Sequence, residues 1–368
     1  MDLIKIAINA HRRVISAKRR KFFIFSLSML ALIAVYSRMQ SVDSNFSYDY
    51  SSYILMVGKI GELSFSEILG DQLLFPYIIT GAFVPVEFGF GLLVKVISLT
   101  GASPATTLSI LAALSVGLRV QVMQSLGIPL IFVLLINLYA ITLFEANALR
   151  LGIASSILLF GLREIYFSRN VSGFMSLLVS TAIHLQVIFF AVPFAIIYIF
   201  FQFIKTSKII LAFAIVLICV STFGLIEFLP LLSNEKIQIY VSQGSSGSAG
   251  LTVTSAAAVI LFTSVVMSLR SKVFQSADAN FFAIVIASSL PSLFLLLFLT
   301  NIAVIGDRAW QLAFIVFSSF FFLNWNNGKS KIIPLLFFNG LLLVCLLNVM
   351  FVNKLSDFFS PPFPFFNP

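Results

Sequence analysis

The stretch KRRKFFIFSLSMLALIAVY, residues 18–36, decides the fold, because four consecutive basic residues lead directly into an apolar run. Seven of the 23 Lys and Arg residues lie before residue 22. Basic residues beside an apolar helix stay on the cytoplasmic side of a membrane. No small-residue cleavage site follows Tyr36, where the chain continues Ser-Arg-Met-Gln, so we expect a retained first span rather than a removed signal peptide.

The composition of the whole chain agrees with this reading. Of 368 residues, 60% are hydrophobic and 10% are charged, and the mean hydropathy is +1.06. Soluble domains have roughly 45–50% apolar and about 25% charged residues, so this chain has too little charge to cover a surface in water. A soluble enzyme, a nucleic-acid binder and a disordered chain are therefore excluded. We predict an all-α polytopic integral membrane protein with about 10–12 transmembrane helices.

A helix needs about 20 apolar residues to cross roughly 30 Å of hydrocarbon. The following ranges are predicted spans: 22–37, 104–120, 128–145, 147–163, 208–228, 252–269, 280–300, 307–324 and 332–352. Residues 68–99 are interrupted by prolines and acids, and residues 173–204 are too long for one span and contain His184 and Pro193. We predict that each is two short helices or a re-entrant hairpin. Broken helices survive at membrane depth where they line protein or a water-filled cavity, so both ranges are candidate site regions.

The charges between the spans predict the orientation. Basic clusters assigned to the cytoplasm are Arg12 to Lys21, Arg163 with Arg169, Lys205 with Lys208, Arg270 with Lys272 and Lys329 with Lys331, and Arg119 joins them. The opposite face then holds outer loops at about 38–82, which is rich in acids, and at 229–251. The predicted organisation is a basic cytoplasmic arm over 1–21, a single transmembrane domain over 22–352 and a C-terminal tail over 353–368, placed outside.

Charges inside the spans are few, and an ionisable side chain at the bilayer centre costs at least ~2.5–3.5 kcal/mol. Glu87 lies in Val-Pro-Val-Glu-Phe-Gly-Phe and is either functional or a carboxylate at a helix N-terminus. Arg150 is either functional or an arginine that reaches the membrane interface. His184 is either a proton-transfer group or a hydrogen bond between helices, and its ordinary pKa suits proton transfer.

Two further sites lie on the predicted outer face. Asp307 and Arg308 open a span, where they form either a local ion pair or an anion site, because a guanidinium matches phosphate geometry. Asp49 lies in a segment with Tyr50 and Tyr53. Carboxylates beside aromatic rings suit sugar binding, although a tyrosine belt at the membrane interface explains the tyrosines equally well.

Several kinds of chemistry have no signal in the sequence. It contains no phosphate-binding glycine loop with a lysine, no His/Cys/acid cluster with metal spacing and no nucleophile elbow. Cys219 and Cys345 are each isolated in an apolar run and are expected to be buried thiols. We therefore expect no metal and no cofactor.

Five short motifs in a fixed order resemble the EpsG-like family of bacterial polysaccharide polymerases, which is related in role to the Wzy-type O-antigen polymerases. They are an Asp/Tyr segment (Asp43, Asp49, Tyr50, Tyr53), Glu87-Phe-Gly-Phe90, Asn147-x-x-Arg-x-Gly-Ile-Ala154, His184 before Pro193, and Arg308 at the start of a late span. The resemblance covers roughly residues 40–320. Phe88 stands where the family usually has Pro, and Leu151 stands where a Gln-like residue usually follows the Arg.

The resemblance implies a glycosyltransferase-type polymerase in the bacterial cytoplasmic (inner) membrane, with its active site outside. It would transfer a glycan from undecaprenyl diphosphate onto a new lipid-linked repeat unit, forming O-antigen, capsule or exopolysaccharide. A chain-length regulator is a further expected partner, and nucleic acid is not. The implied catalytic residues are Arg150, His184 and Glu87, with His184, Glu87 or Asp49 as the base. The implied substrate-binding residues are Arg308, Asp307, Asp49, Tyr50, Tyr53 and Asn147.

Two alternatives remain at this point. A transporter or flippase of lipid-linked sugars would use the same arginines only to hold diphosphate. A membrane acyltransferase would normally use a histidine early in the chain near an acid, and the only early histidine is His11, in the basic arm.

Overall fold

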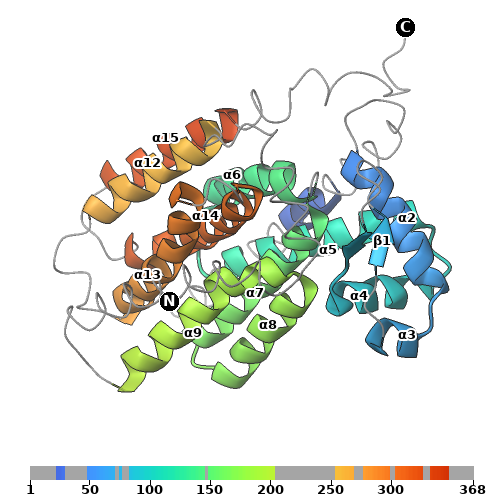
Figure 1. The fold of residues 1–368 in the computed structure, drawn as a ribbon. Coiled ribbons are helices and arrows are strands. Elements are labelled where there is room, and N and C mark those ends of the chain that lie inside the picture. Colours follow the sequence, from blue (N-terminus) through green and yellow to red (C-terminus); the bar gives the residue numbers. More distant parts are fainter. Residues whose placement is uncertain are drawn as a thin grey trace, which may run out of the picture.

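The computed structural model describes residues 22–29, 48–70, 74–76, 83–145, 148–203, 253–268, 277–298, 303–325 and 332–347. Within these ranges the chain is almost entirely helical, with one small hairpin (Figure 1). The elements after residues 22–29 are α2 (Tyr48–Glu62), α3 (Phe65–Gly70), β1 (Leu74–Pro76), β2 (Phe83–Pro85), α4 (Phe88–Ser98), α5 (Pro104–Ser125), α6 (Leu130–Ala140), a π-helical turn (Ile141–Glu145), α7 (Leu149–Tyr166), α8 (Asn170–Ile183), a 3₁₀ turn η2 (Leu185–Val187), α9 (Ile188–Phe203), α12 (Val253–Ser268), α13 (Ala277–Phe298), α14 (Ala303–Trp325) and α15 (Ile332–Leu347).

The predicted spans after residue 100 are helical wherever the structure describes them. Helices α5, α6 with its π turn, α7, α12, α13, α14 and α15 coincide with predicted spans. The span at 208–228 and most of the span at 22–37 lie outside the described residues. In the part of the chain that the structure describes, two stretches, Pro104–Ser125 and Asn280–Leu297, are long and apolar enough to cross a membrane, and several apolar helices of 10–17 residues accompany them.

The two interrupted regions differ in structure. Residues 173–204 form two helices, as predicted, with the break at His184, while Pro193 lies inside α9. Residues 68–99 contain two short helices separated by an antiparallel hairpin that the sequence did not predict, with Leu74 opposite Pro85. Both β1 and β2 end in proline, which is tolerated because each strand is an edge of this two-stranded sheet.

Local sequence signals explain where two of the helices begin. The Ser103 side chain caps α5 by accepting a hydrogen bond from the Thr106 N–H at 3.2 Å, with Pro104 in the first turn. Before α3, the hydroxyl and backbone N–H of Ser64 both donate to the Glu67 carboxylate at 2.6 Å. This is a capping box, and the side-chain hydrogen bond from Ser64 lowers the pKa of Glu67.

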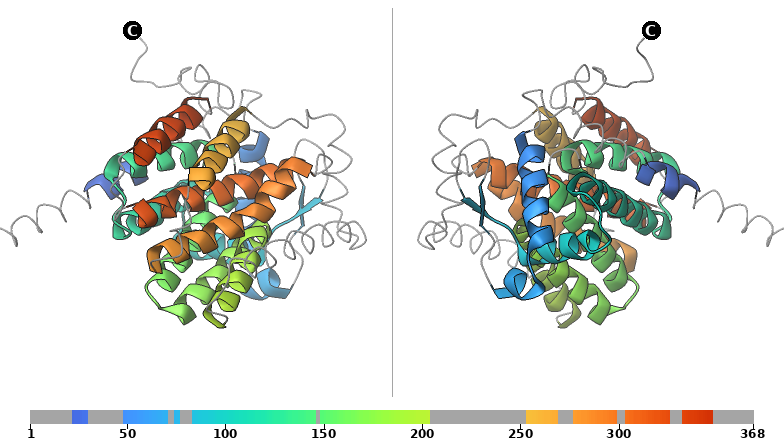
Figure 2. Two further views of the ribbon diagram at one scale, coloured as in Figure 1. Left: turned by 90° about the vertical axis from the view of Figure 1, so that its left-hand side faces the viewer. Right: turned by 90° about the vertical axis from the view of Figure 1, so that its right-hand side faces the viewer.

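The helices pack in layers (Figures 1 and 2). The α13–α14 pair lies between the α12–α15 pair and the α7–α8–α9 group, and α2, α3 and α4 gather beside the last group. Much of the core along α14 is aromatic, with Phe321 stacked on Phe337 at 3.9 Å between ring centroids. Exposed apolar side chains cover the outer faces of α8 and α9, as a lipid-facing surface requires: Val171, Met175, Leu178, Val192 and Ile199.

Arg119, which the sequence assigned to the cytoplasmic side, does not lie on the surface of the described structure. It is 0% exposed within α5. Its Nε donates to Asn137 Oδ1 of α6 at 2.9 Å, and its Nη1 donates to Ser155 Oγ of α7 at 3.4 Å. Arg119 therefore joins three helices in the interior, and polar partners offset the cost of burying its charge.

Candidate functional site

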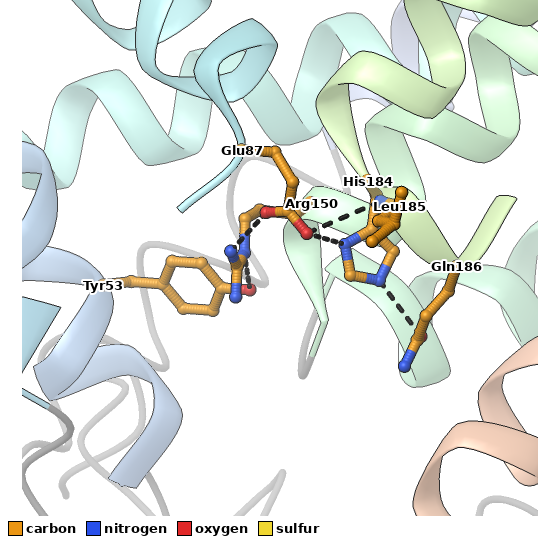
Figure 3. A network of polar contacts seen from close by, with 6 residues as sticks. All are labelled: Tyr53, Glu87, Arg150, His184, Leu185 and Gln186. Carbon is orange, nitrogen blue, oxygen red and sulfur yellow. Dashed lines mark hydrogen bonds and ion pairs between the residues drawn. The ribbon is translucent and has the colours of Figure 1, made fainter. Parts of the chain in front are cut away.

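Glu87, Arg150 and His184 meet although they come from three separate elements (Figure 3). Arg150 Nη1 lies 2.6 Å from Glu87 Oε2, and His184 Nδ1 lies 3.2 Å from Glu87 Oε1. The carboxylate thus has one oxygen on the guanidinium and the other on the imidazole. These are the three residues that the sequence analysis named as catalytic.

The first turn of α4 carries Glu87 to this position. The Glu87 backbone is extended, and its carbonyl accepts hydrogen bonds from the N–H groups of Phe90 and Gly91, which starts the helix. A Cβ on Gly89 would lie 2.7 Å from the Ala182 carbonyl oxygen in the last turn of α8. Only glycine allows the backbones of α4 and α8 to approach this closely, and this approach places Glu87 beside His184.

Arg150 lies in the first turn of α7 and is half-buried. A cation at this position faces the positive end of the helix dipole and benefits from an anionic partner, which Glu87 provides. Tyr53 of α2 supports the guanidinium from the other side: Arg150 Nε donates to its hydroxyl at 3.4 Å, and Arg150 Cζ lies 5.7 Å from its ring centroid. The Tyr53 ring also contacts Phe90 edge-on at 6.3 Å.

His184 occupies the break between α8 and η2, where its extended backbone interrupts the helix. The residue is 3% exposed. Besides the contact with Glu87, its Nε2 lies 3.1 Å from Gln186 Oε1, and the Leu185 N–H points to Glu87 Oε1 at 3.5 Å. A carboxylate oxygen beside Nδ1 favours a proton on Nδ1, so Nε2 is the nitrogen suited to proton exchange.

Gln186 is the residue of this cluster that the sequence analysis did not select. The available signal was weak: one amide two positions after His184 in an otherwise apolar stretch. Its role depends on the 3₁₀ turn, which brings its side chain back to the imidazole.

Asp307 and Arg308 lie on α14, which packs against η2 and α7. The Asp307 carboxylate accepts hydrogen bonds from the Ser255 hydroxyl of α12 and from Gln311 Nε2, the latter at 2.7 Å. These two residues therefore lie on a helix that borders the cluster.

The remaining predicted residues are only partly placed. Asp49 and Tyr50 lie in the first turn of α2, the helix that carries Tyr53, but their side chains are outside the described part of the chain. Asn147 is also outside it. Among the described residues, no three His, Cys, Asp or Glu side chains are grouped to hold a metal ion. Cys345 is buried, with Sγ 3.3 Å from the Leu135 carbonyl oxygen, and Cys219 lies outside the described residues.

Ionisable residues gathered among apolar helices mark a candidate functional site in a helical membrane protein. The sequence model of the EpsG family matches residues 22–362. The chain therefore belongs to the EpsG family, a family of Wzy-like polysaccharide polymerases. Membership indicates, at this coarse level, a glycosyltransferase of the polysaccharide-polymerase type. No curated protein and no solved structure matches the chain.

Proposed function

We propose that this protein joins oligosaccharide repeat units carried on undecaprenyl diphosphate, at the outer face of the bacterial cytoplasmic membrane. The product would be an O-antigen, capsule or exopolysaccharide. The observation that carries the proposal is the Glu87 carboxylate shared between Arg150 and His184. It couples a group suited to a diphosphate with a group suited to removing a proton, and this reaction needs both.

In the proposed reaction, His184 acts as the general base. A hydroxyl of the acceptor sugar gives its proton to His184 Nε2 while its oxygen bonds to the anomeric carbon of the donor. The bond from that carbon to the diphosphate oxygen breaks, and the electron pair leaves with the diphosphate. Glu87 holds Nδ1 and stabilises the imidazolium, as the acid of a Ser-His-Asp triad does for its histidine. The donor already stores the energy of the bond, so no nucleotide is consumed.

Arg150 would stabilise the departing diphosphate. Arg150 donates to Glu87 and Tyr53, and its planar guanidinium has the fork geometry that matches phosphate oxygens. Fixed positive charge where negative charge develops lowers the barrier of such a transfer. We assign Arg308, with Asp307, to a second contact with the lipid-linked substrate, because α14 borders the cluster. Asp49, Tyr50 and Asn147 remain proposed sugar contacts.

The test is polymerisation by the purified full chain in lipid nanodiscs, supplied with a synthetic lipid-diphosphate-linked repeat unit. We expect a ladder of products on a gel, and we expect Arg150→Ala and His184→Ala to abolish it. Arg169→Ala is the matched control, because Arg169 also pairs with a glutamate, Glu164 at 3.3 Å, but near the other end of α7.

Two results would contradict these assignments. Full ladders from both variants at normal expression would show that Arg150 and His184 are not the site. Wild-type protein that moves the lipid-linked repeat across a liposome membrane without lengthening it would overturn the proposed function. That result would identify a flippase.

A further inference from the structure

The row of contacts in Figure 3 has two different ends. Tyr53 and Arg150 lie at one end, Gln186 lies at the other, and Glu87 and His184 lie between them. Arg150 is a fixed cation, whereas Gln186 is a neutral amide with one acceptor and two donors. The two ends therefore suit different chemical groups, an anion at Arg150 and hydroxyls at Gln186.

Glu87 restricts the access to His184. Because Glu87 Oε1 lies on Nδ1, a hydroxyl that gives its proton to the imidazole must reach Nε2. Gln186 Oε1 lies 3.1 Å from that nitrogen. An amide oxygen only accepts, so it pairs with Nε2 while Nε2 carries a proton, and the amide must turn its NH2 group to an unprotonated Nε2. An incoming hydroxyl must therefore replace Gln186 at Nε2 and would then lie next to the displaced amide.

We propose that Gln186 binds the acceptor sugar. In the empty site its amide contacts Nε2 of His184, and when the sugar binds the amide moves away and the attacking hydroxyl takes its place at Nε2. The displaced amide then hydrogen-bonds a neighbouring hydroxyl of the same sugar, which is both a donor and an acceptor. This inference rests on the proposed polymerase function and divides its site into a donor side at Arg150 and an acceptor side at Gln186.

The elements around the break are consistent with this assignment. Helices α8 and α9 carry no charged residue, and the charged residues of α14 are Asp307 and Arg308. The charge in direct contact with His184 is the Glu87 carboxylate, which Arg150 neutralises in turn. A neutral amide can leave Nε2 without changing the net charge around His184. A carboxylate at the same position would favour the charged imidazolium.

A kinetic experiment separates the two sides. The octyl glycoside of the repeat unit serves as acceptor, because without a diphosphate it cannot act as donor. Loss of one hydrogen bond to the acceptor is worth about 1 kcal/mol, so we expect Gln186→Ala to raise KM for this acceptor about five- to tenfold. KM for the lipid-diphosphate donor should stay within about twofold of the wild-type value. Gln186→Asn, which keeps the amide on a shorter side chain, should behave like Gln186→Ala.

Gln186→Glu gives a readout that a purely structural role would not change. A carboxylate at Nε2 stabilises the imidazolium, so the acidic limb of the rate–pH profile should move to higher pH. Gln121→Ala, on an exposed face of α5, is the control and should leave both KM values and the profile unchanged. Equal rises of both KM values, or a wild-type KM for the acceptor, would overturn the proposal.

A spectroscopic measurement does not depend on activity. The chain has two histidines, so ¹⁵N-histidine labelling of the His11→Gln variant reports His184 alone. We expect Gln186→Leu to shift the Nε2 resonance and its titration midpoint, and unchanged resonances would overturn the contact. If the wild type does not lengthen glycans at all, the acceptor role fails together with the proposed function. If it does, a wild-type acceptor KM in Gln186→Ala refutes the Gln186 role alone.

Discussion

At the scale of single residues, the site is organised by one carboxylate with two partners. Truncating either partner would leave the remaining groups of a half-buried cluster without compensation, which costs more than the net worth of the contact. Loss of activity in an alanine variant therefore does not by itself separate chemistry from local stability. Isosteric changes can, because they keep the shape of the cluster and alter its charge.

Glu87→Gln is the clearest isosteric change. The amide keeps the shape of the side chain but cannot stabilise the imidazolium of His184 or neutralise Arg150. We expect the rate of glycan lengthening to fall about 10²–10⁴-fold, as it does when general acid–base catalysis is lost, with expression unchanged. Glu62→Gln, at an exposed carboxylate ending α2, is the control. A Glu87→Gln enzyme within about twofold of the wild-type rate would contradict the role assigned to this carboxylate.

Tyr53 offers a second prediction, because its ring and its hydroxyl both contact Arg150. At 3.4 Å the hydrogen bond is long, so we expect the ring to matter more. Tyr53→Phe should reduce the rate less than about threefold, and Tyr53→Leu about tenfold or more, because a cation–π contact of about 1–2 kcal/mol is lost. The measurement is the rate of glycan lengthening by both variants. Equal effects would show that the hydroxyl is the important group.

The site residues were predictable from the sequence to different degrees. Glu87, Arg150 and His184 stood out because charge is rare in an apolar chain, and all three lie in one cluster. Their pairing was not predictable, because the Arg150–Glu87 and His184–Glu87 contacts span 63 and 97 positions of the chain and depend on how the helices pack. Gln186 carries no charge, and a single amide in an apolar run does not distinguish a site from a helix contact.

At the scale of elements, the break at His184 and the start of α4 form the site together. The sequence placed an interruption in residues 173–204, but Pro193 was as good a candidate for its position as His184. The structure accommodates Pro193 inside α9, as membrane helices commonly do. The hairpin in residues 74–85 was missed because its strands have only three residues each, too few for an alternating pattern.

Gly89→Ala tests this arrangement of elements. The added Cβ would lie 2.7 Å from a backbone oxygen of α8, so α4 must move and carry Glu87 away from His184. We expect activity to fall at least about tenfold even though alanine favours helix formation. Gly70→Ala at the end of α3 is the matched control, because a Cβ there meets nothing within 4 Å. Wild-type activity in a folded Gly89→Ala protein would show that the close approach is not needed.

At the scale of the whole molecule, the helical hairpin of α7 and α8 explains how residues 34 positions apart meet. Helix α7 has 18 residues and α8 has 14, so at 1.5 Å per residue they run about 27 and 21 Å in opposite directions. Arg150 begins the first helix and His184 follows the second, which puts both at one end. Arg163, Glu164 and Arg169 form ion pairs near the other end.

Because the two ends of the hairpin differ in charge, the positive-inside rule predicts on which side of the membrane the site lies. If the arginine-rich end of the hairpin faces the cytoplasm, as the positive-inside rule predicts, the cluster of Glu87, Arg150 and His184 faces outward. Reactive cysteines can test this in right-side-out membrane vesicles from a background with Cys219→Ser and Cys345→Ser. Ser66→Cys, in the predicted outer segment, should react with a membrane-impermeant maleimide. Ser172→Cys, at the start of α8, should react only after the vesicles are opened. Both serines are exposed, so a reversed pattern would place the site in the cytoplasm and exclude polymerisation at the outer face.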